Sequence, residues 1–187
     1  MTLRELLKDP SVTLVRLQEH LGSLSGEDRV RQATDLDRGQ QALLWRLAEG
    51  GGPLTESDIV PTDAAPLAPV PFYGQNNQPI YRSFQKVFYR STSGEVAGYN
   101  VSDAAWFAGP GYYLLRSGPT GLYVDYTAVP EDKPDGWPSI RRNEEGLSRF
   151  VYGNMQDFLR RVYGLILIGR AYRKGRETSN YFVLARP

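Results

Sequence analysis

Residues 143–187 read NEEGLSRFVYGNMQDFLRRVYGLILIGRAYRKGRETSNYFVLARP, and this stretch carries most of the fold prediction. Apolar side chains recur in its first half at the spacing of one buried helical face: Leu147, Phe150, Val151, Met155, Phe158, Leu159 and Val162. Acidic residues at the start and arginines at the end suit the helix dipole. We therefore predict one long amphipathic helix over residues 143–162. Asp157, Arg160 and Arg161 would lie on its solvated side as an ordinary surface ion-pair group.

The second half of the same stretch predicts a β-hairpin. Residues 165–168 form a short run of Leu and Ile, Lys174-Gly175 supplies a turn, and residues 181–184 return as a second apolar run. Both faces of residues 165–172 are largely apolar or aromatic, which indicates a strand covered on both sides.

Four further strands are predicted upstream of this stretch. Residues 81–90 and 95–101 flank one turn, and residues 105–116 and 122–129 flank another. Because nearly every connection is a hairpin, the sheet should be mostly antiparallel. The predicted fold class is therefore α+β: a curved, mostly antiparallel sheet of about six strands with one long helix packed on it, preceded by a small N-terminal helical region.

Changes in composition predict three parts of the chain. Residues 1–52 contain short helical patterns that end at a run of three glycines, so they predict an N-terminal helical region. Residues 53–79 are rich in proline and have no apolar period, which predicts an extended strap or linker pinned by Phe72 and Tyr73. Residues 80–187 would form the sheet domain.

Composition excludes several classes of protein. The chain has 187 residues, no cysteine, and 22 Lys plus Arg against 21 Asp plus Glu. The charge balance argues against nucleic-acid binding, and the absence of cysteine excludes disulfides and thiolate metal sites. No apolar run approaches the roughly 18 residues of a membrane span, and the N-terminus does not resemble a secretory signal. We expect a soluble cytoplasmic protein.

Familiar catalytic and cofactor motifs are missing. The single histidine, His20, lies near the end of a predicted helix. A Ser-His-Asp triad would have to use it, and the sequence contains no Gly-x-Ser-x-Gly nucleophile elbow. The glycine clusters at residues 50–52 and 109–111 lack the spacing and the lysine of a phosphate-binding loop. We expect no cofactor and no metal.

Asp125 is the strongest candidate for chemistry. It lies in mid-strand on a face that would be covered, where a carboxylate needs a partner, and Arg170 is the obvious one. The pair could be a structural ion pair that fixes strand register. It could instead form the floor of an aromatic pocket that binds a ligand. The residues that would line this pocket are Trp106, Tyr112, Tyr113 and Tyr123.

Three functional hypotheses remain open from the sequence. The first is a non-catalytic module that binds a small molecule or a protein partner through this aromatic pocket. The alternative is a lyase- or isomerase-type enzyme that uses Asp125 as general acid or base. The third is a structural subunit that forms a homo-oligomer through its N-terminal helices.

Overall fold

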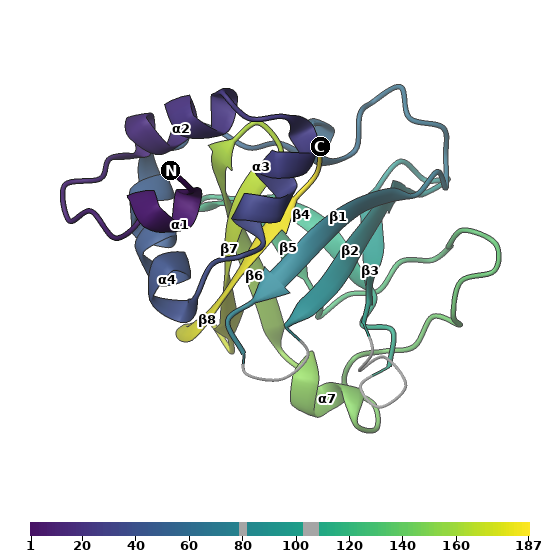
Figure 1. Ribbon diagram of the computed structural model, residues 1–187. Coiled ribbons are helices and arrows are strands. Elements are labelled where there is room, and N and C mark those ends of the chain that lie inside the picture. Colours follow the sequence, from purple (N-terminus) through teal and green to yellow (C-terminus); the bar gives the residue numbers. More distant parts are fainter. Residues whose placement is uncertain (79–81, 103–108) are drawn as a thin grey trace.

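The computed structural model describes residues 1–78, 82–102 and 109–187 and shows a closed, antiparallel β-barrel (Figure 1). Each strand pairs with the next along the chain, and β8 pairs with β1 to close the barrel. The strands are β1 (Val70–Asn76), β2 (Ser83–Arg90), β3 (Val96–Val101), β4 (Tyr113–Gly118), β5 (Gly121–Asp125), β6 (Met155–Tyr163), β7 (Ile166–Arg173) and β8 (Arg176–Ala185). The helices are α1 (Leu3–Leu6), α2 (Leu14–Gly22), α3 (Gly26–Ala33), α4 (Arg38–Leu47), η1 (Ala48–Gly50), α5 (Glu56–Ile59) and α7 (Ser148–Val151).

The predicted α+β fold with six strands and one long helix is therefore wrong, and the long helix is the main error. Within residues 143–162 the only helix is α7, and residues 155–162 belong to β6. Gly153 packs so closely that a Cβ there would lie 2.4 Å from the Arg149 carbonyl oxygen, and Asn154 has a φ of 54°. This tight turn ends α7 and starts β6.

The apolar pattern of β6 explains the error. Asp157 and Leu159 face the barrel interior, whereas Phe158 and Val162 belong to the cluster under the N-terminal helices. Both faces of β6 are covered, so apolar residues occur in both phases of the strand. That distribution matches a helical spacing as well as it matches a strand.

The second missed strand is β1, which lies in the proline-rich stretch. Asn76 donates its backbone N–H to the Arg82 carbonyl, so every second residue of β1, counted from Asn76, bonds to β2. Pro71 belongs to the other set of alternate residues, whose backbone groups face β8. The β1–β8 pairing begins only at Tyr73, beyond Pro71. The proline therefore removes no ladder hydrogen bond, which is the position where a strand tolerates it.

The hairpin predicted in the C-terminal stretch is confirmed. β7 and β8 pair across the Lys174-Gly175 turn, and both turn residues have positive φ, as the two-residue hairpin turn that matches strand twist requires. The short helices predicted in the first 50 residues are also confirmed, as α1 to α4.

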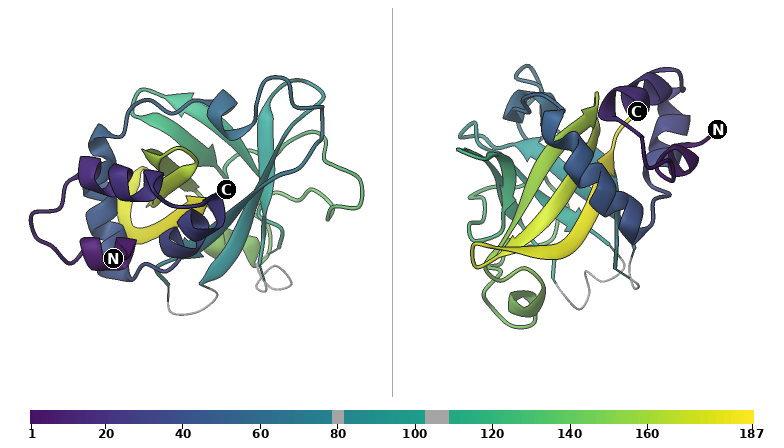
Figure 2. Two further views of the ribbon diagram at one scale, coloured as in Figure 1. Left: turned by 45° about the horizontal axis from the view of Figure 1, so that its top comes forward. Right: turned by 90° about the vertical axis from the view of Figure 1, so that its left-hand side faces the viewer.

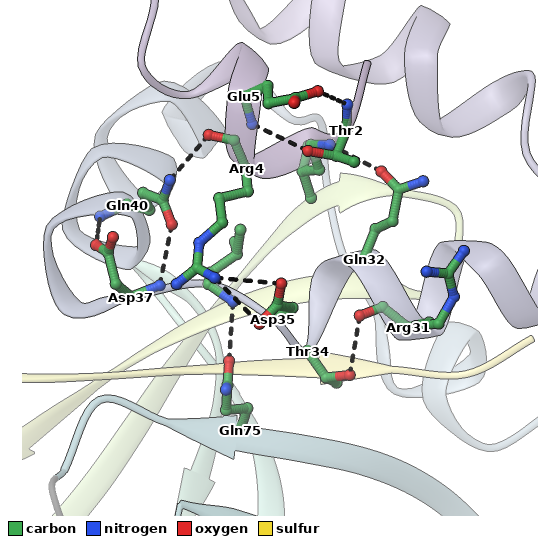
Figure 3. Close-up of polar contacts among 12 residues, drawn as sticks. Thr2, Arg4, Glu5, Arg31, Gln32, Thr34, Asp35, Asp37, Gln40 and Gln75 are labelled. Atoms are coloured by element: carbon green, nitrogen blue, oxygen red, sulfur yellow. Dashed lines mark hydrogen bonds and ion pairs between the residues drawn. The ribbon is translucent and has the colours of Figure 1, made fainter.

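The N-terminal helices cover the outer face of β6, β7 and β8 (Figure 2). Val162, Ile168 and Val183 are fully buried beneath them. A polar contact fixes the helical region to the barrel: Gln75 of β1 accepts the Leu36 N–H with its side-chain oxygen at 3.0 Å (Figure 3). Within the part of the chain that the structure describes, none of the helices is both long and apolar enough to cross a bilayer.

The barrel interior is an apolar core that is sealed at one end. Ile59 and Val60, at the end of α5 and just after it, are fully buried in the same cluster as Leu122 and Leu167. Asp58 of α5 pairs with Arg161 at 2.9 Å, close to the C-terminal end of β6. The segment around α5 therefore closes the end of the barrel that lies opposite α7.

Candidate functional site

The other end of the barrel, beside α7, contains a cavity of about 380 Å³. In an up-and-down barrel the odd strands end where the even strands begin, and the cavity lies at that end. Residues of β1, β2, β3, β6, β7 and β8 line it together with α7. Its wall is largely aromatic and aliphatic: Phe84, Tyr126, Val151, Tyr152, Met155 and Phe182.

A buried ion pair crosses the barrel at the inner side of this cavity. Lys86 projects from β2 and Asp157 from β6, and these strands are separated by three strands in either direction around the barrel. The Lys86 Nζ lies 3.1 Å from an Asp157 carboxylate oxygen, and the two side chains are only 2% and 5% exposed. The pair therefore spans the lumen and forms a polar floor beneath an apolar wall.

Two neutral side chains complete the floor. Lys86 donates to Asn100 Oδ1 at 3.1 Å and to the Tyr126 hydroxyl. Asn100 is the cross-strand neighbour of Lys86 on β3, and its Nδ2 donates to Tyr126 at 3.0 Å and to the Gly111 carbonyl at 3.2 Å. All three protons of the ammonium thus have an acceptor, as a buried cation requires.

Aromatic rings surround the same ammonium. Lys86 Nζ lies 4.9 Å from the ring centre of Tyr126, 5.0 Å from that of Tyr113 and 5.3 Å from that of Phe182. Cations this close to aromatic rings are attracted by the ring quadrupole, most strongly where water is excluded. The site is therefore built for a positive charge at this position.

Burial sets the protonation behaviour of the floor. It lowers the pKa of the Lys86 ammonium, and the Asp157 carboxylate opposes this effect by favouring the charged form. Burial and the nearby Asp157 charge raise the pKa of Tyr126 well above its ordinary value. Tyr126 therefore remains a neutral hydroxyl at physiological pH and can donate a hydrogen bond.

Arg173 of β7 holds one wall of the cavity in place. Its guanidinium donates to the carbonyls of Phe150 and Val151 at 3.1 and 2.6 Å, so it fastens α7 to the strand end. Asn180 of β8 lies at the rim, where its side-chain oxygen accepts from Gln78. The rim is thus polar and the wall apolar.

Comparison with protein-family models, curated proteins and solved structures finds no match. The described residues contain no group of three or more His, Asp or Glu side chains placed to hold a metal ion. The polar side chains at the floor of the cavity are those of Lys86, Asp157, Asn100 and Tyr126.

Of the predicted residues that the structure describes, none lines this cavity. Tyr113 faces the interior beside Lys86, but Tyr123 stacks on Phe158 outside the barrel, with ring centres 5.1 Å apart. Tyr112 stacks on Tyr99, and its hydroxyl donates to the Pro138 carbonyl at 2.6 Å. Trp106 lies outside the described residues. A role of these residues in ligand binding stays a prediction.

Asp125 and Arg170 do not form the expected pair, although the structure describes both. The Asp125 carboxylate accepts from the Thr127 backbone N–H and hydroxyl at 3.0 and 2.7 Å. Arg170 pairs with Glu177 at 2.6 Å and donates to the Thr178 carbonyl. Because Leu122, Val124 and Tyr126 take the interior positions around β5, Asp125 is left on the outer face.

Sequence reasoning missed Lys86 and Asp157, although a signal for each was present. On β2, Lys86 occupies the same phase as Phe84 and Phe88, so it is a charged residue in the apolar phase of a strand. Asp157 lies two residues before Leu159 on β6, so it too is a charged residue on the apolar, inward-facing side of a strand. The predicted helix hid this second signal, because it placed Asp157 on the solvated side.

Tyr152, which stacks on Tyr126 at 5.1 Å, gives the site a pH dependence that can be measured. Burial raises the pKa of Tyr152 to about 12 from a usual value of 10. The folded state therefore favours the neutral phenol. Below pH 10 the phenol is neutral in both states and its full contribution to stability is present. Between pH 10 and about 12 the unfolded chain ionises first, so this contribution is lost.

We expect Tyr152→Phe to lose less stability than the wild type over this alkaline range, by roughly 2 kcal/mol. Urea unfolding at pH 9 and pH 11.5 measures the difference, and Tyr73→Phe, at an exposed tyrosine of β1, is the control. Parallel loss in Tyr152→Phe and the wild type would contradict a buried, neutral Tyr152.

Proposed function

We propose that this barrel binds a small molecule with an apolar body and a hydrogen-bonding polar head in the cavity beside α7. The observation that carries this proposal is the buried Lys86–Asp157 pair at the inner end of an apolar cavity of about 380 Å³. This volume lies within the range of about 300–1,000 Å³ typical of ligand pockets. An eight-stranded barrel with a covered aromatic interior is compatible with a ligand-binding module.

Stability alone is a poor explanation for the pair. Two charges inside a barrel cost desolvation free energy, and well-packed apolar side chains in their place are often equally stable or more so. The cavity above the pair gives these charges a use, because a polar head there can replace Asn100 or Tyr126 as a partner of Lys86. The apolar body of the ligand would then pack against Phe84, Met155 and Phe182.

A ligand of this kind enters the cavity past the rim at Asn180, and three compounds with the same apolar chain and different polar heads test whether it binds there. We expect octan-1-ol and octanoate to raise the melting temperature of the wild type, because a ligand that binds only the folded state stabilises it. Octylamine should shift it least, since its ammonium would lie beside Lys86 and Arg173. Differential scanning fluorimetry over a concentration series measures all three.

A matched pair of tryptophan variants locates the binding. Asn180→Trp places a bulky ring at the cavity rim and should abolish the thermal shift. Thr120→Trp places the same ring in the exposed β4–β5 turn, at the opposite end of the barrel, and should leave the shift unchanged. Equal shifts in both variants would place binding outside the cavity and contradict the proposal.

A further inference from the structure

Lys86 differs from the other cationic residues of the chain in its surroundings. The sequence has four lysines and 18 arginines among its 22 Lys plus Arg residues, and only Lys86 among these lysines lines the cavity. Lys8 and Lys174 are exposed, and Lys133 is half-buried. A lysine amine, unlike a guanidinium, shifts its pKa readily when buried and can act as a nucleophile.

We propose that Lys86 binds carbonyl compounds covalently, as a protonated imine between its Nζ and the carbon of an aldehyde or ketone. This inference rests on the proposed function, since it assigns a ligand class to the same cavity. The class is a carbonyl compound with an apolar chain, the chain lying along Phe84, Met155 and Phe182 and the carbonyl group at the polar floor.

The bonds and charges balance without any further reactant. The Lys86 amine, having passed a proton to Asp157, adds to the carbonyl carbon, and the π pair of the C=O bond moves to oxygen. The oxygen takes up two of the three protons of the original ammonium and leaves as water. The nitrogen keeps one proton and the positive charge. Asp157, 3.1 Å away, faces one positive charge before and after the reaction.

The hydrogen bonds of the floor fit this change in proton number. The ammonium has three acceptors, whereas a protonated imine has one N–H, which Asp157 can take. Asn100 and Tyr126 then lose the lysine as a donor, but they already bond to each other, with Asn100 Nδ2 donating to the Tyr126 hydroxyl at 3.0 Å. Neither becomes a buried polar group without a partner, a situation that would cost free energy.

The remaining surroundings favour the imine over the free components. The rings of Tyr113, Tyr126 and Phe182 surround Lys86 Nζ, so they can stabilise the iminium cation in the same way as they stabilise the ammonium. The neutral Tyr126 hydroxyl can donate to the carbonyl oxygen while it departs. Burial, which lowers the pKa of Lys86, increases the fraction of free amine that can attack.

The experiment traps the imine by reduction. Wild-type protein is incubated at pH 7 with octanal and sodium cyanoborohydride, and the adduct is located by intact mass and peptide mapping. We expect one octyl group on Lys86, at least tenfold more than on Lys8, Lys133 or Lys174. Excess octan-1-ol, which competes for the cavity without a carbonyl, should suppress it, and Asn180→Trp should lack it. The double variant Lys86→Met/Asp157→Leu, which keeps the floor neutral, should gain none there.

The outcomes separate the two proposals. If octan-1-ol raises the melting temperature but no adduct forms on Lys86, the imine is overturned and the binding cavity stands. If neither a thermal shift nor an adduct is found, both are overturned. An adduct spread evenly over all four lysines overturns the imine, because it shows ordinary surface amine chemistry.

Discussion

Asp157→Leu is expected to lower the free energy of unfolding by roughly 3–5 kcal/mol, because it leaves the Lys86 ammonium buried without its counter-charge. The double variant Lys86→Met/Asp157→Leu should recover most of this loss, since it replaces both charges with apolar groups of similar size. Urea denaturation of the wild type, both single variants and the double variant gives the coupling free energy directly.

The control is an ion pair on the surface. Arg116 and Glu95 lie 2.8 Å apart, but their side chains are 41% and 42% exposed. Glu95→Leu should therefore change stability by no more than about 1 kcal/mol. If Asp157→Leu changes stability as little as Glu95→Leu does, the charges of the floor are not buried as the structure shows.

The loss in Asp157→Leu should also depend on pH. Without Asp157, no counter-charge opposes the effect of burial, and the pKa of Lys86 in the folded state falls further below its unfolded value. A group with a lowered folded pKa stabilises the fold at pH values above its unfolded pKa, and this contribution is lost as the pH falls through the folded pKa. The penalty of Asp157→Leu should therefore be larger at pH 6 than at pH 9. An equal penalty at both values would indicate lost packing rather than a buried charge.

Local sequence signals predicted the parts of this fold that depend on neighbours in the chain. The Lys174-Gly175 turn predicted the β7–β8 hairpin, and the apolar spacing before the glycine run predicted the N-terminal helices. Barrel closure could not be predicted in this way. It depends on β1 pairing with β8, whose residues are more than 100 positions away along the chain, and no local pattern records that contact.

The candidate site was not predictable for a related reason. Its floor joins Lys86 to Asp157 across the lumen, and their meeting follows only from strand order. The sequence predicted a role for Asp125 instead, because it places this carboxylate in mid-strand on a face expected to be covered, where a carboxylate needs a partner. Thr127, two residues away, supplies that partner, and the side chain faces outward.

Removal of residues 1–50 is expected to make the barrel associate or fail to fold, because the N-terminal helices cover the outer face of β6, β7 and β8. Five apolar side chains that are fully buried on the outer face of β6, β7 and β8 would become exposed: Val162, Ile166, Ile168, Val183 and Ala185. Arg160 of β6 would also lose Trp45 of α4, whose ring centre lies 4.1 Å from its guanidinium carbon. A contiguous apolar patch of this kind promotes association.

A protease site inserted beside Gly52 provides the control for this deletion. The site is inserted after Gly52, which is exposed, so that Gly51, where a Cβ would lie 1.8 Å from the Arg161 carbonyl oxygen, stays unchanged. After cleavage, the two pieces should elute together at the mass of the intact chain, and the isolated C-terminal piece should shift to larger species by light scattering.

If the intact protein is an oligomer that dissociates on deletion, the helices join subunits, as the third sequence-based hypothesis holds. If the truncated chain stays monomeric and melts like the wild type, β6 to β8 do not need their cover. Only association or unfolding of the separated barrel would show that the helices complete its hydrophobic core.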